Sequence, residues 1–268
     1  MRRAVRVMAL CATLAGCAIA PSPERLADPL ADHPVLLLGE VHDNATGLQW
    51  RNALLERRVA AGWRPAIAME QFDRERQADL DRAMASCADA DCVIAAAASP
   101  QARWDWPQYR PAIALALRHR LPLIAANVSR ADAARAMREG FGAVFDAALV
   151  AEYRLDAPLP RELEAAQSRE IDAGHCGKLP AAMLPAMVRA QVARDIWMAA
   201  ALRAHAHRGV VLLAGNGHVR RDLGVPRWLD GLAGVASIGF VEEPAPAGAF
   251  DREVALPKRE RADPCAGL

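Results

Sequence analysis

The chain has 268 residues, with 33 basic and 32 acidic side chains and a formal net charge of +1. A nearly neutral chain lacks the basic surface that contact with nucleic-acid phosphates requires. Its length suits one large domain with its own core. Beyond the amino terminus, no segment is long and apolar enough to cross a membrane. Nucleic-acid-binding and multi-span membrane proteins are therefore excluded.

Residues 1–16 are typical of a lipoprotein signal peptide. Three arginines precede the apolar run 7–14, and residues 14–17, Leu-Ala-Gly-Cys, resemble the bacterial lipobox. The apolar run is too short to span a bilayer, so cleavage before Cys17 and lipidation of Cys17 are expected. Ala18 replaces the aspartate that usually retains such proteins at the inner membrane, which favours an outer-membrane anchor on the periplasmic face. The mature chain keeps 30 basic and 32 acidic side chains.

The order of apolar runs and breaker residues predicts a three-layer α/β sandwich with a mostly parallel central sheet. Residues 17–34 are expected to form a lipidated tether, 35–243 the folded domain and 244–268 a loosely held, proline-rich tail. Strands are predicted at 35–38, 65–69, 121–126, 209–214 and 235–241, and helices at 45–61, 74–85, 106–120, 129–139, 186–207 and 226–232. Mixed signals at 140–184 indicate an inserted, mainly helical subdomain.

Four cysteines remain after signal cleavage and lipidation of Cys17. An even number in an oxidising compartment predicts two disulfides, for which three pairings exist. Cys87 and Cys92 bracket a short polar loop, which favours this pair and leaves Cys176 with Cys265. A zinc site built from these thiols is the weaker alternative.

Two predicted strands end in the same pattern, Gly-x-x-His. Gly39-Glu40-Val41-His42 follows the first strand, and Gly215-Asn216-Gly217-His218 follows a late one. Glu70 and Asn127 end two further strands. Because ligands bind at the carboxyl edge of open parallel sheets, we expect these side chains to share one site.

The chemistry of this site is open at the level of sequence. His42, His218 and Glu70 can ligate a divalent metal, or the imidazoles and carboxylates can serve as general acids and bases. On the predicted helix 186–207, Arg194 can clamp an anion, neutralise Glu40 or Glu70, or pair with an acid to tie the helix to the sheet. The motifs of serine hydrolases, zincins and dinucleotide-binding proteins are missing.

The segment 140–184 carries a second set of candidates. A tyrosinate such as Tyr153 can ligate ferric iron, and His175 with Lys178 can contact haem propionates. An exposed loop beside a disulfide is the simpler interpretation of His175 and Lys178.

Several blocks resemble the ChaN family of iron-regulated, haem-binding lipoproteins, and together they cover nearly all of the mature chain in the expected order. The blocks are residues 37–44, 69–74, 125–130, 175–180, 191–198, 215–218 and 224–226. The resemblance implies an α/β fold related to the erythromycin esterase, TraB and Tiki group. It also implies haem binding by dimers, with a tyrosine on the iron. Neither Tyr109 nor Tyr153 lies in a matching block, so the haem tyrosine is not carried over.

The resemblance places Glu40, His42, Glu70 and His218 in a superfamily site that is hydrolytic in some members. The leading hypothesis is a lipid-anchored haem-binding protein for haem or iron uptake, which forms a homodimer on haem binding and works with an outer-membrane haem receptor. The alternative is a metal-dependent hydrolase that uses the four residues with Arg194 and Asn216. A periplasmic scaffold is a third possibility, and the sequence leaves open whether the protein is an enzyme.

Overall fold

The computed structural model describes residues 33–263, 265 and 266, and its centre is a six-stranded sheet. All neighbouring strands pair in parallel, in the order β3-β2-β4-β1-β5-β6, which confirms the predicted fold class. The strands are β1 (Val35–Leu38), β2 (Ala66–Asp73), β3 (Leu123–Asn127), β4 (Val210–Leu213), β5 (Val235–Val241) and β6 (Arg252–Ala255). Every residue of β1 and β4 is buried, because helices cover both faces of the sheet.

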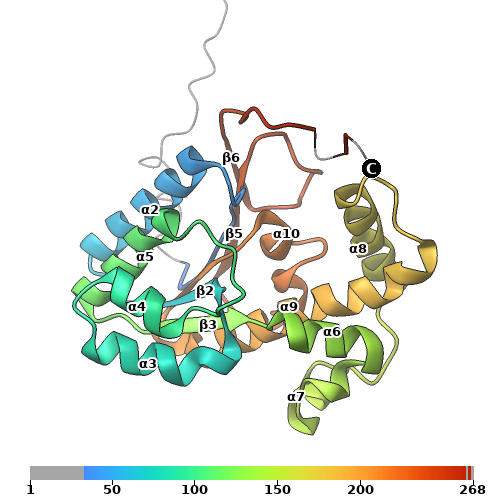
Figure 1. The fold of residues 1–268 in the computed structure, drawn as a ribbon, viewed down its shortest axis with the longest axis horizontal. Coiled ribbons are helices and arrows are strands. Elements are labelled where there is room, and N and C mark those ends of the chain that lie inside the picture. The colour runs from blue at the N-terminus through green and yellow to red at the C-terminus, as the bar shows by residue number, and fades with distance from the viewer. Residues whose placement is uncertain (1–32, 264, 267–268) are drawn as a thin grey trace, which may run out of the picture.

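Helices form the two outer layers (Figure 1). They are α2 (Ala45–Ala60), α3 (Gln77–Ser86), α4 (Ala90–Ala97), α5 (Trp106–His119), α6 (Arg130–Glu139), α7 (Ala147–Glu152), α8 (Arg161–Gly174), α9 (Leu184–His205) and α10 (Asn216–Val219). Short 3-10 turns lie at Arg74–Arg76, Phe141–Ala143, Ala181–Met183, Ala206–Arg208 and Val225–Trp228. No helix in the described part of the chain is long and apolar enough to span a membrane.

Alternate side chains of β1 enter two different cores. Leu36 and Leu38 pack with α2, α3, α4 and α5 on one face, whereas Val35 and Leu37 pack with α6 and α9 on the other. This follows from the strand geometry, which points successive side chains to opposite faces. The strand ends, where ligand sites form in such sheets, are thereby held between two helical layers.

The helix ends follow local signals in the sequence. Asn44 caps α2 by accepting a bond from the Gly47 N–H at 2.9 Å, and Ser129 caps α6. The expected helix 74–85 begins as a 3-10 turn, because β2 continues past its expected end to Asp73 and pairs there with Asn127. Helix α4 was not predicted, because its alanine-rich sequence has little polar contrast.

Between residues 140 and 184 the chain forms α7, α8 and 3-10 turns, with no strand. Both predicted disulfides, Cys87–Cys92 and Cys176–Cys265, are present. The second one joins the loop before α9 to the carboxyl-terminal segment. The predicted signal peptide and the predicted lipidation site at Cys17 lie outside the described residues, as does most of the predicted tether.

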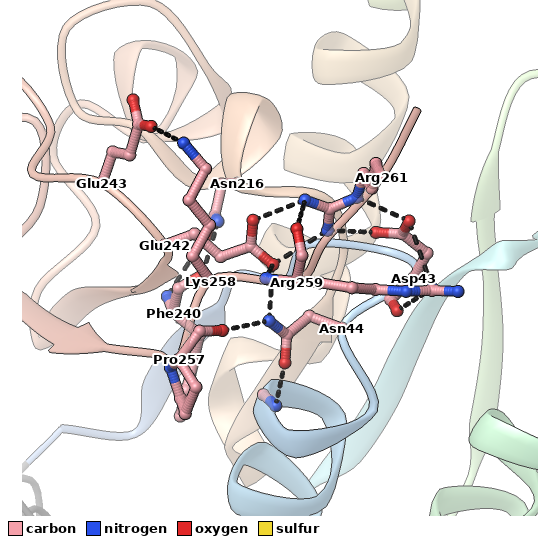
Figure 2. Close-up of polar contacts among 11 residues, drawn as sticks. Asp43, Asn44, Asn216, Phe240, Glu242, Glu243, Pro257, Lys258, Arg259 and Arg261 are labelled. Carbon is pink, nitrogen blue, oxygen red and sulfur yellow. Dashed lines mark hydrogen bonds and ion pairs between the residues drawn. The ribbon is translucent and has the colours of Figure 1, made fainter. Parts of the chain in front are cut away.

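The carboxyl-terminal segment differs from the expected loose tail, because β6 adds an edge strand to the sheet. Beyond β6, the Arg261 guanidinium bonds to both carboxylate oxygens of Asp43, at 2.7 and 2.6 Å, and to those of Glu242, at 2.6 and 2.8 Å (Figure 2). The bond from Arg261 lowers the pKa of Glu242 to about 2. Strand β6 was not predicted, because only Val254 of its four residues is buried and the segment has no aliphatic run.

Candidate functional site

The carboxyl ends of β1, β2, β3 and β4 line a single cavity of about 1150 Å³. Its walls include the side chains that were predicted at the strand ends. Residues of α6, α9 and the loop before α5 complete the walls. The lining residues used below are Glu40, His42, Glu70, Gln71, Trp104, Asn127, Arg130, Gln191, Arg194, Gly215, Asn216 and His218. The structure therefore places the two Gly-x-x-His turns at one site, as parallel pairing of β1 with β4 requires.

Glu40 is buried and is held by three side chains from different parts of the chain. It forms an ion pair with Arg51 of α2, whose side chain is fully buried. The Tyr109 hydroxyl donates to Glu40 Oε1 at 2.6 Å, and His42 Nδ1 lies 2.8 Å from the same oxygen. Burial lowers the pKa of Arg51 to about 10, so Arg51 stays charged at neutral pH. Glu40 is thus a fixed counter-charge that orients His42, and not a free acid or base.

His42 presents its second ring nitrogen to the cavity. Its Nδ1 is engaged by Glu40 and its side chain is 46% exposed. Its ring packs edge to face with Trp104, with the ring centroids 5.0 Å apart. A Cβ built on Gly215 would lie 3.0 Å from His42 Nε2, so a side chain at position 215 would crowd the ring in its present place. Carboxylate contact at Nδ1 fixes the tautomer and leaves Nε2 for chemistry or ligation.

Glu70 lies between the two imidazoles. Its Oε2 accepts a bond from the Gly215 N–H at 2.7 Å, and its Oε1 lies 3.6 Å from His218 Nε2. Burial raises the pKa of Glu70, but the charges of His218 and His42 and the Gly215 N–H more than offset this and lower it. Glu70 is therefore ionised at neutral pH.

His218 is buried and repeats the arrangement of His42. Its Nδ1 lies 2.6 Å from Asp195 Oδ1, and its Nε2 lies 3.3 Å from Gln191 Nε2. Burial lowers the pKa of His218, yet the carboxylates of Asp195 and Glu70 outweigh burial and raise it. Two carboxylate–imidazole pairs, Glu40 with His42 and Asp195 with His218, therefore flank Glu70.

Three members of this site were not found from sequence. Asp195, Arg51 and Tyr109 were not assigned to the site. A signal for Arg51 does exist, because it lies three residues after Leu48 on the buried stripe of a helix, where a lone arginine needs a counter-charge.

Asn216 is a structural residue. Its carboxamide pairs with β5 by donating to the Phe240 carbonyl at 2.7 Å and accepting from the Phe240 N–H at 3.2 Å, as Figure 2 shows. Both polar groups of the side chain are therefore engaged by backbone. Asn127 donates to Asp73 at 3.2 Å, which joins the ends of β3 and β2.

The second candidate set lies outside the cavity lining. The Tyr153 ring is packed in the core against Trp228, and burial raises its pKa, which disfavours a tyrosinate. His175 is exposed at the end of α8, where its Nδ1 lies 2.7 Å from the Ile171 carbonyl, and Lys178 is exposed in the loop that follows. The Tyr153 ring contacts Arg203 near the end of α9, whereas His175 and Lys178 precede its start.

Among residues 33–263 and 265–266, no group of three or more His, Cys, Asp or Glu side chains is spaced to hold a metal ion. His42, His218 and Glu70 share the cavity but not the geometry of a ligand set. The structure gives no support to the divalent-metal interpretation.

Loss of Arg51 tests the anchoring of Glu40. We expect Arg51→Met to lower the free energy of unfolding by about 3–5 kcal/mol, because it leaves a buried carboxylate without its counter-charge. The double variant Arg51→Met/Glu40→Gln should recover most of this loss in urea unfolding. Strictly additive losses in the double-mutant cycle would show that the pair is not coupled.

The pH dependence of His218 follows from its two carboxylates. Its folded-state pKa lies above the ordinary value of 6.5, so the protonated ring stabilises the fold fully below pH 6.5. That contribution is lost as the pH rises through the folded-state pKa. A ring ¹⁵N NMR titration, assigned with His218→Gln, should give a pKa above 6.5 that Asp195→Asn lowers. A midpoint below 6.5 in the wild-type protein would contradict the arrangement.

The comparisons with known proteins agree with this architecture. The family model described as "Haem-binding uptake, Tiki superfamily, ChaN" matches residues 26–229. A structure of cofacial haem binding to ChaN of Campylobacter jejuni is similar with a TM-score of 0.66 and 21% identity, over 85% of this chain and 89% of that one. At this identity the likeness shows the fold alone.

Two further structures are more distant. A mutant of the erythromycin esterase EreC gives a TM-score of 0.47 at 13% identity, over 81% of this chain and 72% of that one. RRSP, a MARTX toxin effector domain from Vibrio vulnificus, gives 0.46 at 13% identity, over 87% of this chain and 37% of that one. Comparison with curated protein sequences gave no match. Because the family model spans most of the chain, including both turns that form the cavity, the chain belongs to the ChaN family of haem-binding uptake proteins in the Tiki superfamily.

Proposed function

We propose that this protein is a lipid-anchored haem carrier for haem uptake and that haem binds in the cavity at the strand ends. The observation that carries the proposal is the cavity itself, about 1150 Å³ in volume. Cofactor sites are usually the largest well-formed cavities of a protein and lie at the carboxyl ends of parallel strands. Membership of a haem-binding family supports haem as the ligand.

The donor set of the cavity fits haem. A porphyrin needs a broad wall, an iron ligand and cationic partners for its carboxylates. Trp104 supplies an aromatic wall, His42 a half-exposed imidazole, and Arg103 and Arg194 supply guanidinium groups. When bound, haem would supply an iron centre for which His42 Nε2 is the ligand that the chain offers.

His42 suits this role better than Tyr153 does. Glu40 holds the Nδ1 of His42, which fixes the orientation of the ring and leaves Nε2 as its free nitrogen, as in carboxylate–histidine metal sites. Tyr153 is buried in the core, where its raised pKa opposes the tyrosinate form. Of the two oriented imidazoles that line the cavity, His42 is the one with the half-exposed side chain.

Haem titration of the mature domain tests the proposal. We expect a saturable change of the Soret band for the wild-type protein, a loss of the imidazole-type spectrum in His42→Ala, and no change in Tyr153→Phe. The two variants are matched, because each removes one candidate iron ligand. Absence of a saturable Soret change in the wild-type protein contradicts the proposal. Loss of haem binding in Tyr153→Phe alone would place the site in the inserted segment.

The proposed anchor rests on the lipobox at residues 14–17. We expect the full-length protein to fractionate with the outer membrane and Cys17→Ser to release it from lipid, measured by detergent partitioning and mass of the amino-terminal peptide. An unmodified Cys17 in the membrane fraction contradicts this assignment. A second copy of the chain and an outer-membrane haem receptor are the partners that this role implies.

A second function, acid–base hydrolysis, is favoured by one specific observation. Two carboxylate–imidazole pairs flank the ionised Glu70. In ester hydrolysis, His42 Nε2 would take a proton from the attacking water and the protonated His218 would donate one to the leaving oxygen. Glu70 would stabilise the positive charge that His42 gains.

Loss of either imidazole tests this second function. On any ester or peptide that the wild-type protein cleaves, His42→Ala and His218→Gln should each lower kcat/KM by about 10²- to 10⁴-fold. Tyr153→Phe serves as the control outside the cavity. Absence of turnover by the wild-type protein across ester and peptide panels counts against hydrolysis and leaves haem binding unaffected.

A further inference from the structure

The segments that lead into the strands lie side by side at the amino edge of the sheet, opposite the cavity. The Pro34 carbonyl accepts a bond from the Val210 N–H at 2.8 Å, and the Gly209 carbonyl accepts one from the Ala66 N–H at 2.9 Å. The segments before β3 and β5 are joined to β2 and β1 in the same way. We call this surface the basic edge, and its residues are 33–34, 61–65, 118–122, 203–209 and 229–234.

The basic edge carries five arginines, four histidines and a single acid, Asp230. Arg64, Arg120 and Arg208 are exposed and form no ion pair within residues 33–263 and 265–266. The Arg208 guanidinium donates to the Arg64 carbonyl at 3.3 Å, so these two residues are neighbours on one surface. Burial and then the charges of neighbouring cations lower the pKa of His205, which shows that like charges meet here. The formal net charge of the whole chain, +1, does not reveal this concentration of cations.

Helix ends explain these cations only in part. Basic side chains are common at the carboxyl end of a helix, where they bond the last carbonyls, as Arg64 does at the end of α2. This explanation applies to each helix singly and does not account for the scarcity of acids on a surface that three helix ends share. On another part of the surface Arg110 pairs with Asp91 at 2.6 Å, whereas on the described basic edge Arg118 alone has an acid, Glu56 at 3.4 Å.

The predicted tether enters the fold at this edge. The described chain starts at His33, whose carbonyl accepts a bond from Arg58 at 3.3 Å, and residues 17–32 connect it to Cys17. These residues can span at most about 55 Å, so a lipid on Cys17 would keep the domain close to the bilayer. The basic edge can therefore face the bilayer without the tether having to run around the domain.

We propose that the basic edge is a membrane-facing surface, which binds the anionic headgroups of phospholipids around the anchor. The proposal rests on the proposed lipidation of Cys17 and is independent of the ligand of the cavity. Guanidinium donors match phosphate oxygens in two-point contacts, and each arginine near an anionic bilayer strengthens the attraction. Because neighbouring strands are all parallel, this orientation turns the cavity at the carboxyl edge away from the lipid.

Vesicle binding by the unlipidated chain tests the surface apart from the anchor. The mature chain, residues 17–268 with Cys17→Ser, is sedimented at low and at physiological salt with vesicles of phosphatidylcholine, with or without phosphatidylglycerol. We expect salt-sensitive binding to the anionic vesicles, which Arg64→Gln, Arg120→Gln and Arg208→Gln each weaken about fivefold and together about 100-fold. The triple variant Arg161→Gln/Arg169→Gln/Arg252→Gln is the matched control, because it removes the same charge from exposed positions outside the basic edge.

Tryptophan quenching in the lipidated protein tests the orientation. Trp63 lies on the basic edge, with the Arg58 guanidinium 4.2 Å from its ring centroid, whereas Trp104 lines the cavity. The protein is placed on anionic vesicles that contain a phospholipid with a spin-labelled headgroup. We expect Trp63→Phe to remove more of the quenching of the wild-type fluorescence than Trp104→Phe does.

The outcomes separate the surface from the anchor. Equal vesicle binding by the triple variant of the basic edge and by its control overturns the surface and keeps the anchor. Equal binding to neutral vesicles, or binding to duplex DNA as tight as to anionic vesicles, overturns the assignment to anionic lipid. Stronger quenching of Trp104 than of Trp63 overturns the orientation. An unmodified Cys17 in the mature protein overturns the anchor and the membrane-facing role together.

Discussion

The buried ion pair between Arg51 and Glu40 is the interaction on which the geometry of the cavity depends. It joins α2 to the end of β1, and the Tyr109 hydroxyl of α5 adds a third element at the same carboxylate. Removing two charges from water is costly and is offset only when the remaining donors and acceptors are satisfied. In this protein the immobilised carboxylate fixes the orientation of the His42 ring.

The cavity contains two carboxylate–imidazole pairs of the same geometry. Each imidazole has a carboxylate at Nδ1, and Glu70 lies between the two rings, bonded to the Gly215 N–H. An oriented imidazole can ligate iron or move a proton, so the two proposed functions, haem binding and hydrolysis, draw on the same groups.

Much of this organisation could be predicted from local signals. Strands such as β1 and β4 are continuous aliphatic runs in the sequence. The two Gly-x-x-His turns mark the edge of the sheet where ligands bind, because parallel strands end on the same side. The spacing of Cys87 and Cys92 was enough to select both disulfides, because pairing the two close cysteines leaves one remaining bridge. The caps at Asn44 and Ser129 are local hydrogen bonds and were visible for the same reason.

The side chains that hold His218 and Glu40 could not be predicted, because they lie in distant parts of the chain. Asp195 reaches His218 across 23 positions, and Tyr109 reaches Glu40 across 69, without any local pattern to connect them. Strand β6 is held by backbone pairing and ion pairs that involve only one buried side chain, so its sequence carries no alternation. The Tyr153 ring is buried in the core, which its residue type alone does not show.

By itself, the sequence determined which segments form the buried strands, where the polar side chains leave the sheet and which family the chain resembles, because these depend on local order along the chain. The tertiary structure decided which of those side chains are charged, paired or available. Burial raises the cost of every charge, and only the three-dimensional arrangement shows whether a counter-charge is present. It provides one for Glu40 and one for His218.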